Sequence, residues 1–444
     1  MPDRSGSVPI GVRTEPVGPN RGVPTAPRKG VPTAPNWNRI ELLSALAIVL
    51  AAVAVLEAAY SQSPVPPGVD PGDWLQRSFA FVGLPHPPSM AVGSPFLYPP
   101  LAFPFLGALV LATGSPLTAG FVFGGALLAA YGLACIVLGW VYLRPGAARP
   151  LFVGLAVLNG TTLSMLFWGG YPNVFGFVFL SLAFVGLLRF LRSPTLENGL
   201  LMYGMAGLTY LTHTLSFAML IVGALGAIVL VATSRPAVVR SFFRPKALLS
   251  TLGLLVPAGT YEVLSTVFHI THPGYLYANP AALVLDNLGE LFQPLGGAPM
   301  FFPSGPTFVT SPRVVLGILL VSAAALVGLV LYLDRRSPGW LTDPIRVAIG
   351  WLAATLVVPA LGDLAHIGTD YTRFVYFFPL PISLLVALVF ERISAPSAAK
   401  NPTAAPEPVP AAVGGRSSRR SPSRSSSRAS GFLGVLFVVV VLLT

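Results

Sequence analysis

The chain has 444 residues, of which 54% are hydrophobic and only 10% are charged. Apolar segments of about 20 residues recur from end to end, which indicates repeated membrane crossing and excludes a soluble globular protein. In a membrane protein, Lys and Arg mark the cytoplasmic loops. We therefore interpret the net charge of +11 as evidence of membrane topology, and we expect no nucleic-acid partner.

The N-terminal segment, residues 1–38, predicts a disordered basic tail on the cytoplasmic side. It is rich in Pro, Gly and Arg and repeats the sequence GVPTAP, a composition that cannot bury a core. A transmembrane core is expected over residues 39–392, and its first span covers roughly residues 40–60.

A first outer loop is expected over residues 61–116. It opens with SQSPVPPG, a rigid linker, and continues with GVDPGDWLQRSF. Asp70 followed by Pro71 is typical of a helix N-cap and first helical position. The three- and four-residue spacing of Trp74, Leu75 and Phe79 predicts a helix that lies flat in the interface with its aromatic face in lipid.

The later spans are predicted to begin near residues 117, 151, 174, 199, 214, 247, 313, 345 and 372. Segment 98–114 carries three prolines in its first seven residues, which leaves about 10 regular helical residues, too few to cross. Treating it as a juxtamembrane or re-entrant helix places the basic loops near 144, 192, 235–246, 335 and 416–428 in the cytoplasm.

This topology places most of the chemically reactive side chains on the outer face. Of the 27 Lys and Arg residues, only Arg77, Arg313 and Arg373 face outward. All five histidines then face outward, and His213 sits in a tight turn between two spans. A second long outer loop, residues 269–312, is too long for a simple connector.

The C-terminal part predicts a disordered Arg/Ser/Pro-rich linker over residues 393–430. Residues 431–444 are apolar, but 14 residues fall short of the usual 17 or more. They are expected either to form a final span that starts in the cytoplasm or to precede a further outer domain.

Two carboxylates in the first outer loop, Asp70 and Asp73, are the candidate catalytic groups. Held at the lipid and water boundary, one of them can accept a proton from a hydroxyl. Alternatively the pair holds a divalent cation such as Mg²⁺ or Mn²⁺, because both prefer oxygen ligands. The structural alternative is that Asp70 caps the helix and Asp73 complements its dipole.

The order of motifs resembles the type C (GT-C) superfamily of membrane glycosyltransferases. The resemblance rests on a first span, a loop opening with GVDPGDWL, a VGLPHPP step, YPPL at residues 98–101, and the later segments FWGGYPNVFGFVFLSLAF and DYTRFVYFFPLPISLLVAL. The chain departs from some branches of the superfamily, because it lacks a WWDYG block and has Tyr98 where lipid A aminoarabinose transferases carry lysine.

The resemblance implies an all-α fold with about 10–11 transmembrane helices and juxtamembrane helices in the first outer loop. It further implies an inverting transfer of a hexosyl or pentosyl group from a polyprenyl phosphate to a glycan, lipid or protein acceptor, on the extracytoplasmic face of the plasma membrane. Asp70 matches the catalytic first-loop acid, with Asp73 the second choice. The expected substrate and phosphate contacts are Arg373, Arg77, Tyr98, His213, Tyr171, Asn173 and Asp370.

Two other functions are consistent with a basic polytopic chain. A secondary transporter of a small or lipid-linked solute is expected to carry ionisable groups near the membrane midplane, often in two related halves, and the chain shows no repeated half. A noncatalytic membrane scaffold of the same fold fits motifs that are short and degenerate.

Overall fold

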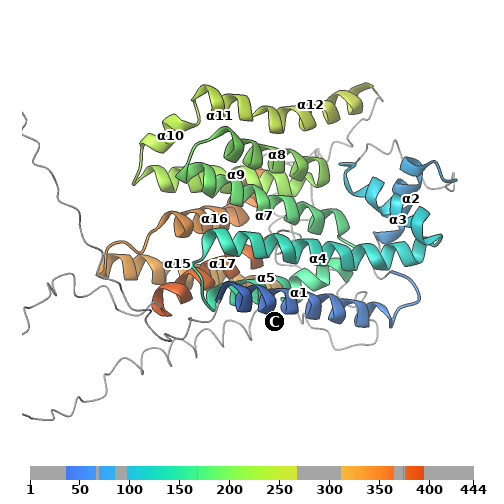
Figure 1. Cartoon of the computed structure of the whole chain (residues 1–444), viewed down its shortest axis with the longest axis horizontal. Helices are drawn as coiled ribbons and strands as arrows, with labels where there is room; N and C mark the ends of the chain where they lie inside the picture. Colours follow the sequence, from blue (N-terminus) through green and yellow to red (C-terminus); the bar gives the residue numbers. More distant parts are fainter. Residues whose placement is uncertain are drawn as a thin grey trace, which may run out of the picture. The chain divides into compact units, whose positions relative to one another are not determined.

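The computed structural model describes residues 37–66, 70–85, 98–167, 169–267, 312–364, 374 and 376–394, and it contains helices and no strand within these ranges. Figure 1 shows long helices lying roughly parallel to one another, with α2 and α3 at one end of them. In chain order the helices are α1 (Trp37–Tyr60), α2 (Pro71–Val82), α3 (Ala102–Thr113), α4 (Pro116–Tyr142), α5 (Ala148–Val157), α6 (Gly160–Phe167), α7 (Tyr171–Arg192), α8 (Leu196–Thr212), α9 (Thr214–Ala232), α10 (Ala237–Ser241), α11 (Pro245–Ser250), α12 (Leu252–Val267), α15 (Pro312–Arg336), α16 (Asp343–Leu364) and α17 (Pro379–Ser394).

Seven segments in the described part of the chain are long and apolar enough to cross a membrane. They are α1, α4, α5 with α6, α7, α9, α11 with α12, and α16. Three further helices pack beside them, α8 on α7, α17 on α5 and α16, and α15 on α17. The protein is therefore an all-α, multi-pass membrane protein, as the composition predicts.

The span predicted to begin near residue 151 is broken into two helices, α5 and α6, at Asn159. The Asn159 side chain donates to the carbonyls of Leu155 and Ala156 and accepts from the backbone N–H of Thr162 at 2.7 Å. An asparagine side chain can replace backbone hydrogen bonds of a helix in this way, so a helix is expected to end at such a residue. The hydropathy pattern does not reveal it.

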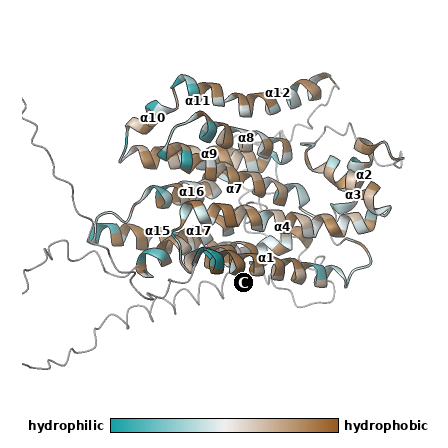
Figure 2. Ribbon diagram, in the orientation of Figure 1, coloured by the Kyte–Doolittle hydropathy of each residue, from teal (hydrophilic) through white to brown (hydrophobic). Residues whose placement is uncertain are grey.

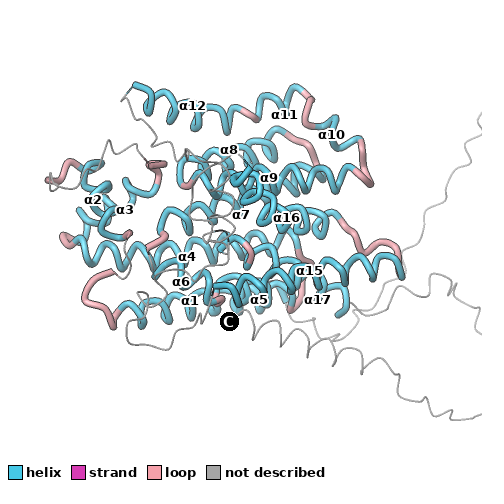
Figure 3. The backbone as a smooth tube through the Cα atoms, turned by 180° about the vertical axis from the view of Figure 1, so that it is seen from behind, coloured by secondary structure: helices cyan, strands magenta, loops and turns pink. Residues whose placement is uncertain are grey.

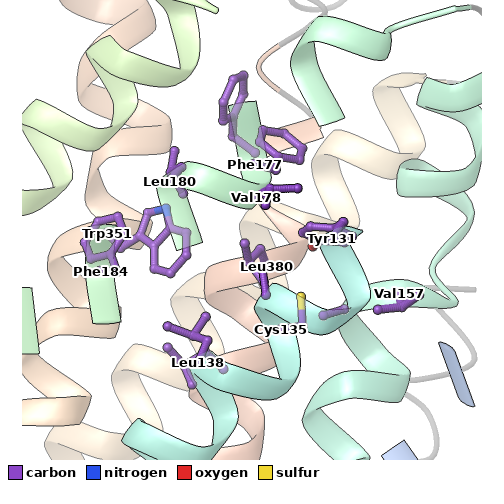
Figure 4. Close-up of a cluster of buried hydrophobic side chains, with 14 of the residues drawn as sticks. Tyr131, Cys135, Leu138, Val157, Phe177, Val178, Leu180, Phe184, Trp351 and Leu380 are labelled. Atoms are coloured by element: carbon purple, nitrogen blue, oxygen red, sulfur yellow. The ribbon is translucent and has the colours of Figure 1, made fainter. Parts of the chain in front are cut away.

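Small residues let the central helices approach closely. Gly186 of α7 lies so near α8 that a Cβ there would come within 2.6 Å of the Met202 nitrogen. Phe184 of α7 stacks on Trp351 of α16, with ring centroids 3.9 Å apart, as in the buried cluster of Figure 4. Close packing of this kind drives helix association in a bilayer, where the hydrophobic effect between helices is absent.

Charged residues gather at one end of the bundle, which we call the basic end. Of the loops predicted to share one side of the membrane, those near 144, 192, 235–246 and 335 lie in the described part of the chain and meet there, and Figure 2 shows hydrophilic segments in α10, in α11 and near the end of α15. The ion pairs that join helices at this end are Arg144–Glu391, Arg149–Glu41 and Arg235–Asp343.

At the opposite end, which we call the α2 end, α3 packs against α2 and α4. Helix α3 has 12 residues, which confirms that segment 98–114 forms only a short helix. The same end contains the turns between α6 and α7 and between α8 and α9 (Figure 3). The short helices α2 and α3 therefore lie against the turns that connect the long ones.

The first test concerns the buried pair of Arg149 and Glu41, which ties α5 to α1. Both side chains are almost fully buried, with 8% and 3% exposed and an N–O distance of 3.1 Å. We expect Arg149→Met to lower the free energy of unfolding by about 3–5 kcal/mol, because it leaves the Glu41 charge buried alone. Reversible unfolding in detergent micelles measures this change.

Arg144→Met is the matched control, since it removes an ion pair whose arginine side chain is 73% exposed. Exposed pairs contribute about 1 kcal/mol or less. Equal destabilisation by the two substitutions would contradict the role assigned to the buried pair.

Candidate functional site

Helix α2 is docked on the protein through Trp74. The side chain is only 8% exposed, and its indole Nε1–H donates to the backbone carbonyl of Gly169 at 2.6 Å. Trp74 also stacks on Phe103 of α3, with centroids 5.8 Å apart. The expectation that the aromatic face of this helix lies in lipid is therefore wrong for Trp74, because a buried indole needs a hydrogen-bond acceptor and finds one in the α6–α7 turn.

The α6–α7 turn is shaped to receive α2. Gly169 has φ +89°, a conformation that side chains with a Cβ rarely adopt, and a Cβ at this position would overlap Pro71 at the start of α2. Just before the turn, the carbonyl of Leu166 accepts from the Tyr60 hydroxyl at the end of α1, at 3.0 Å. The two glycines of the WGGYPN motif thus include one that allows a close approach of α2 rather than of a ligand.

Tyr98 and His213 come together beside Trp74. The Tyr98 ring centroid lies 5.0 Å from that of Trp74 and 6.3 Å from that of His213. The backbone N–H of Leu101 donates to the carbonyl of Leu211 at 3.0 Å, which ties the segment before α3 to the end of α8. Two residues predicted for the site, separated by more than 100 positions, are therefore neighbours.

His213 is both the C-cap of α8 and the N-cap of α9. Its side chain is buried, its Nδ1 accepts from the backbone N–H of Ser216 at 3.2 Å, and the same atom lies 2.9 Å from the Ser216 hydroxyl. The histidine is therefore the capping residue of α9. This capping role fixes the ring beside Tyr98.

The two acids lie at the start of α2. Asp70 occupies the N-cap position, and its backbone carbonyl accepts from the Trp74 N–H at 3.0 Å, but its side chain makes no capping hydrogen bond. Asp73 accepts from the Nε of Arg77 at 2.8 Å, one helical turn later. The predicted N-cap position is correct, while the expected side-chain cap is not formed.

Arg77 carries an unsatisfied donor. Its side chain is only 15% exposed, and its Nη1 is buried with no hydrogen-bond partner among the described residues. The guanidinium carbon lies 5.9 Å from the centre of the Trp74 ring. A buried guanidinium N–H without an acceptor is costly, so an anionic oxygen at this position is favourable.

Tyr171 and Asn173 lie within the helix packing at the start of α7. Tyr171 is fully buried and donates from its hydroxyl to the carbonyl of Gly120 in α4 at 3.2 Å. Asn173 is 3% exposed. We assign both side chains to the packing of α7.

Arg373 and Asp370, the remaining predicted contacts, lie outside the described residues, and so do the other four histidines and the second outer loop at 269–312. The tail, linker and final apolar segment at 1–36 and 395–444 also lie outside them.

The sequence leaves Asp70 and Asp73 as alternative ligands for Mg²⁺ or Mn²⁺. In the described part of the chain no three His, Cys, Asp or Glu side chains cluster in a way that suits a metal ion. One of the two carboxylates, Asp73, is already paired with Arg77. We therefore derive no step through a metal.

Comparison with known proteins finds no matching family model and no matching curated sequence. The residue that the sequence prediction misplaced is Trp74. Its helical spacing fits a lipid-facing and a protein-facing helix equally, and the contact that decides between them is the hydrogen bond to the distant Gly169 carbonyl.

The docking of α2 can be tested at Gly169. We expect Gly169→Ala to destabilise the protein by more than about 1 kcal/mol, because alanine disfavours the positive φ and its methyl group overlaps Pro71. Amide hydrogen exchange measures the consequence, which is faster exchange in residues 73–82. Gly259→Ala is the control, since a Cβ there meets nothing within 4 Å, and α2 exchange that is equal in both variants would contradict the docking.

Proposed function

We propose that the protein is a membrane glycosyltransferase that moves a sugar from a polyprenyl-phosphate donor to an acceptor hydroxyl, with inversion at the anomeric carbon. One observation carries the proposal: a short docked helix presents Asp70, Asp73 and a largely buried Arg77 whose Nη1 has no hydrogen-bond partner among the described residues. A carboxylate and a phosphate-binding cation on one rigid element are the two parts that such a transfer needs.

In the proposed reaction Asp70 is the general base. It takes the proton of the acceptor hydroxyl while the hydroxyl oxygen bonds to the anomeric carbon from the face opposite the phosphate. The bond between that carbon and the phosphate oxygen breaks, and polyprenyl phosphate leaves with the electron pair. Asp73 positions the guanidinium, because its carboxylate accepts from the Arg77 Nε at 2.8 Å.

Arg77 is proposed to bind the phosphate of the donor. Its Nε is committed to Asp73, so the unsatisfied Nη1 remains for a phosphate oxygen. Arginine suits this role because its planar fork can hold a carboxylate and a phosphate at once. Tyr98 lies between Trp74 and His213, and Tyr98 and His213 are proposed to line the sugar site.

The orientation in the membrane follows from the charges. The basic end carries the interhelical arginines, so the positive-inside rule places it in the cytoplasm. The α2 end then faces the outside of the plasma membrane, where a polyprenyl-linked donor and a glycan, lipid or protein acceptor meet.

Asp70→Asn tests the assignment of the base. We expect the kcat of sugar transfer to fall at least about 100-fold, the usual contribution of a general base, with the thermal unfolding of the protein unchanged. Transfer from a panel of short-chain polyprenyl-phosphate sugars by purified protein measures this.

Asp73→Asn is expected to act differently, raising the KM for the donor because it releases Arg77. Glu197→Gln, which changes an exposed carboxylate in the first turn of α8, is the matched control and leaves both constants unchanged. Full activity of the Asp70→Asn variant would contradict the assignment of Asp70 as the general base.

Arg77→Lys tests the phosphate contact. Lysine keeps the charge but cannot hold the carboxylate and the phosphate in one planar fork. We expect kcat/KM for the donor to fall about tenfold, as for the loss of one charge-assisted hydrogen bond, because the charge on the leaving phosphate grows as its bond to the sugar breaks. Arg335→Lys at the basic end is the control, and an unchanged kcat/KM in the Arg77 variant would be evidence against phosphate binding.

A further inference from the structure

An apolar groove of about 330 Å³ lies between α7, α8 and α9 and is closed by α10 and the start of α12. Its lining includes Leu187, Ala206, Leu220, Ala224, Ile228 and Phe242. The one hydroxyl that the described lining residues supply is that of Tyr203. The volume is at the lower end of the range for pockets that bind small ligands, about 300–1,000 Å³.

The groove does not reach the candidate catalytic site. Its α9 residues run from Leu220 to Ile228, which lie 7 to 15 residues after His213, or about 10–22 Å along a helix. Helix α10, which closes the groove, follows the end of α9 at the basic end. A ligand in this groove therefore does not share the acids of α2.

Three cations stand at the closed end of the groove. Arg240, Arg244 and Lys246 are exposed, and they flank the lining residues Val239, Phe242 and Phe243 in sequence. None of the three lies within ion-pair distance of a carboxylate in the described part of the chain. The whole segment from residue 198 to residue 261 contains no Asp or Glu.

This arrangement differs from that of the neighbouring Arg235. Arg235 is half-buried and bonded to Asp343 of α16, so its charge holds two helices together. The cations of residues 240–246 have no such partner in the described part of the chain, and the apolar groove lies beside them. An apolar chain joined to an anionic head group is complementary to both features.

We propose that this groove binds one acyl chain of an anionic glycerophospholipid, with the phosphate held by Arg240 and Arg244. The lipid comes from the leaflet at the basic end of the bundle. Its chain fills the space between α8 and α9, and its head group covers α10. The proposal does not depend on sugar transfer, since no residue of the groove belongs to the α2 site.

Native mass spectrometry of the full chain, released from nanodiscs of equal parts phosphatidylglycerol and phosphatidylcholine with the same acyl chains, tests the proposal. We expect the wild-type protein to retain one phosphatidylglycerol about tenfold more often than phosphatidylcholine. Arg240→Gln with Arg244→Gln is expected to bring this ratio close to one. The control pair, Arg335→Gln with Arg336→Gln, removes two cations at the end of α15 and leaves the ratio unchanged.

Ala224→Phe fills the groove and is expected to reduce retention of both lipids at least fivefold. Ala54→Phe, on an exposed face of α1, is the matched control and retains lipid as the wild type does. Equal retention by these two variants overturns the proposal. Preferential retention of polyprenyl phosphate over phosphatidylglycerol in the same groove would also overturn it.

A second measurement uses the unaltered protein, so it does not depend on the folding of any variant. Phosphatidylglycerol with a photoactivatable diazirine in its acyl chain is expected to label Ala224, Leu225 or Ile228, as mapped by peptide mass spectrometry. Labelling confined to the exposed face of α1 or α12 would contradict an acyl chain in the groove.

Discussion

The hydrogen bond from the Trp74 indole to the Gly169 carbonyl is the contact on which the candidate site depends. Helix α2 has 12 residues, a length that is only marginally helical in isolation. The buried indole, with Pro71 against Gly169 and α3 alongside, holds it in one position. The docking of α2 therefore fixes the positions of Asp70, Asp73 and Arg77. A site on a rigid helix is held more precisely than one on a mobile loop.

The fold class and the order of helices follow from the sequence because hydropathy and the distribution of arginines are properties of whole segments. The loops near 144, 192 and 235 do meet at one end of the bundle, and α2 begins where Asp70 and Pro71 predict. The length of α3 follows from its prolines. Each of these features depends on neighbours in sequence or on summed composition.

Features that depend on contacts between distant residues were not predictable in the same way. The pattern around Trp74 is equally consistent with a lipid-facing and a protein-facing helix, and only the Gly169 carbonyl decides between them. Tyr171 and Asn173 follow two glycines, a feature that a turn and a ligand site explain equally well. The burial of both side chains, and the contact of Tyr171 with α4, are tertiary properties. The pair of Glu41 and Arg149 joins α1 to the start of α5, more than 100 residues away in sequence.

The pairing of each cation distinguishes structural arginines from binding ones. Arg149 and Arg235 bond to carboxylates of another helix, so their charges are compensated within the protein. Arg77 has one nitrogen compensated by Asp73 and another buried without an acceptor, which is the state expected of a cation that completes its hydrogen bonds with a substrate phosphate. Arg240 and Arg244 have no carboxylate within reach in the described chain and stand beside an apolar groove. Because an uncompensated cation at a membrane surface attracts anionic lipid, we propose that both ends of this protein bind phosphate-bearing lipids, one as a substrate and the other as a bound component of the fold.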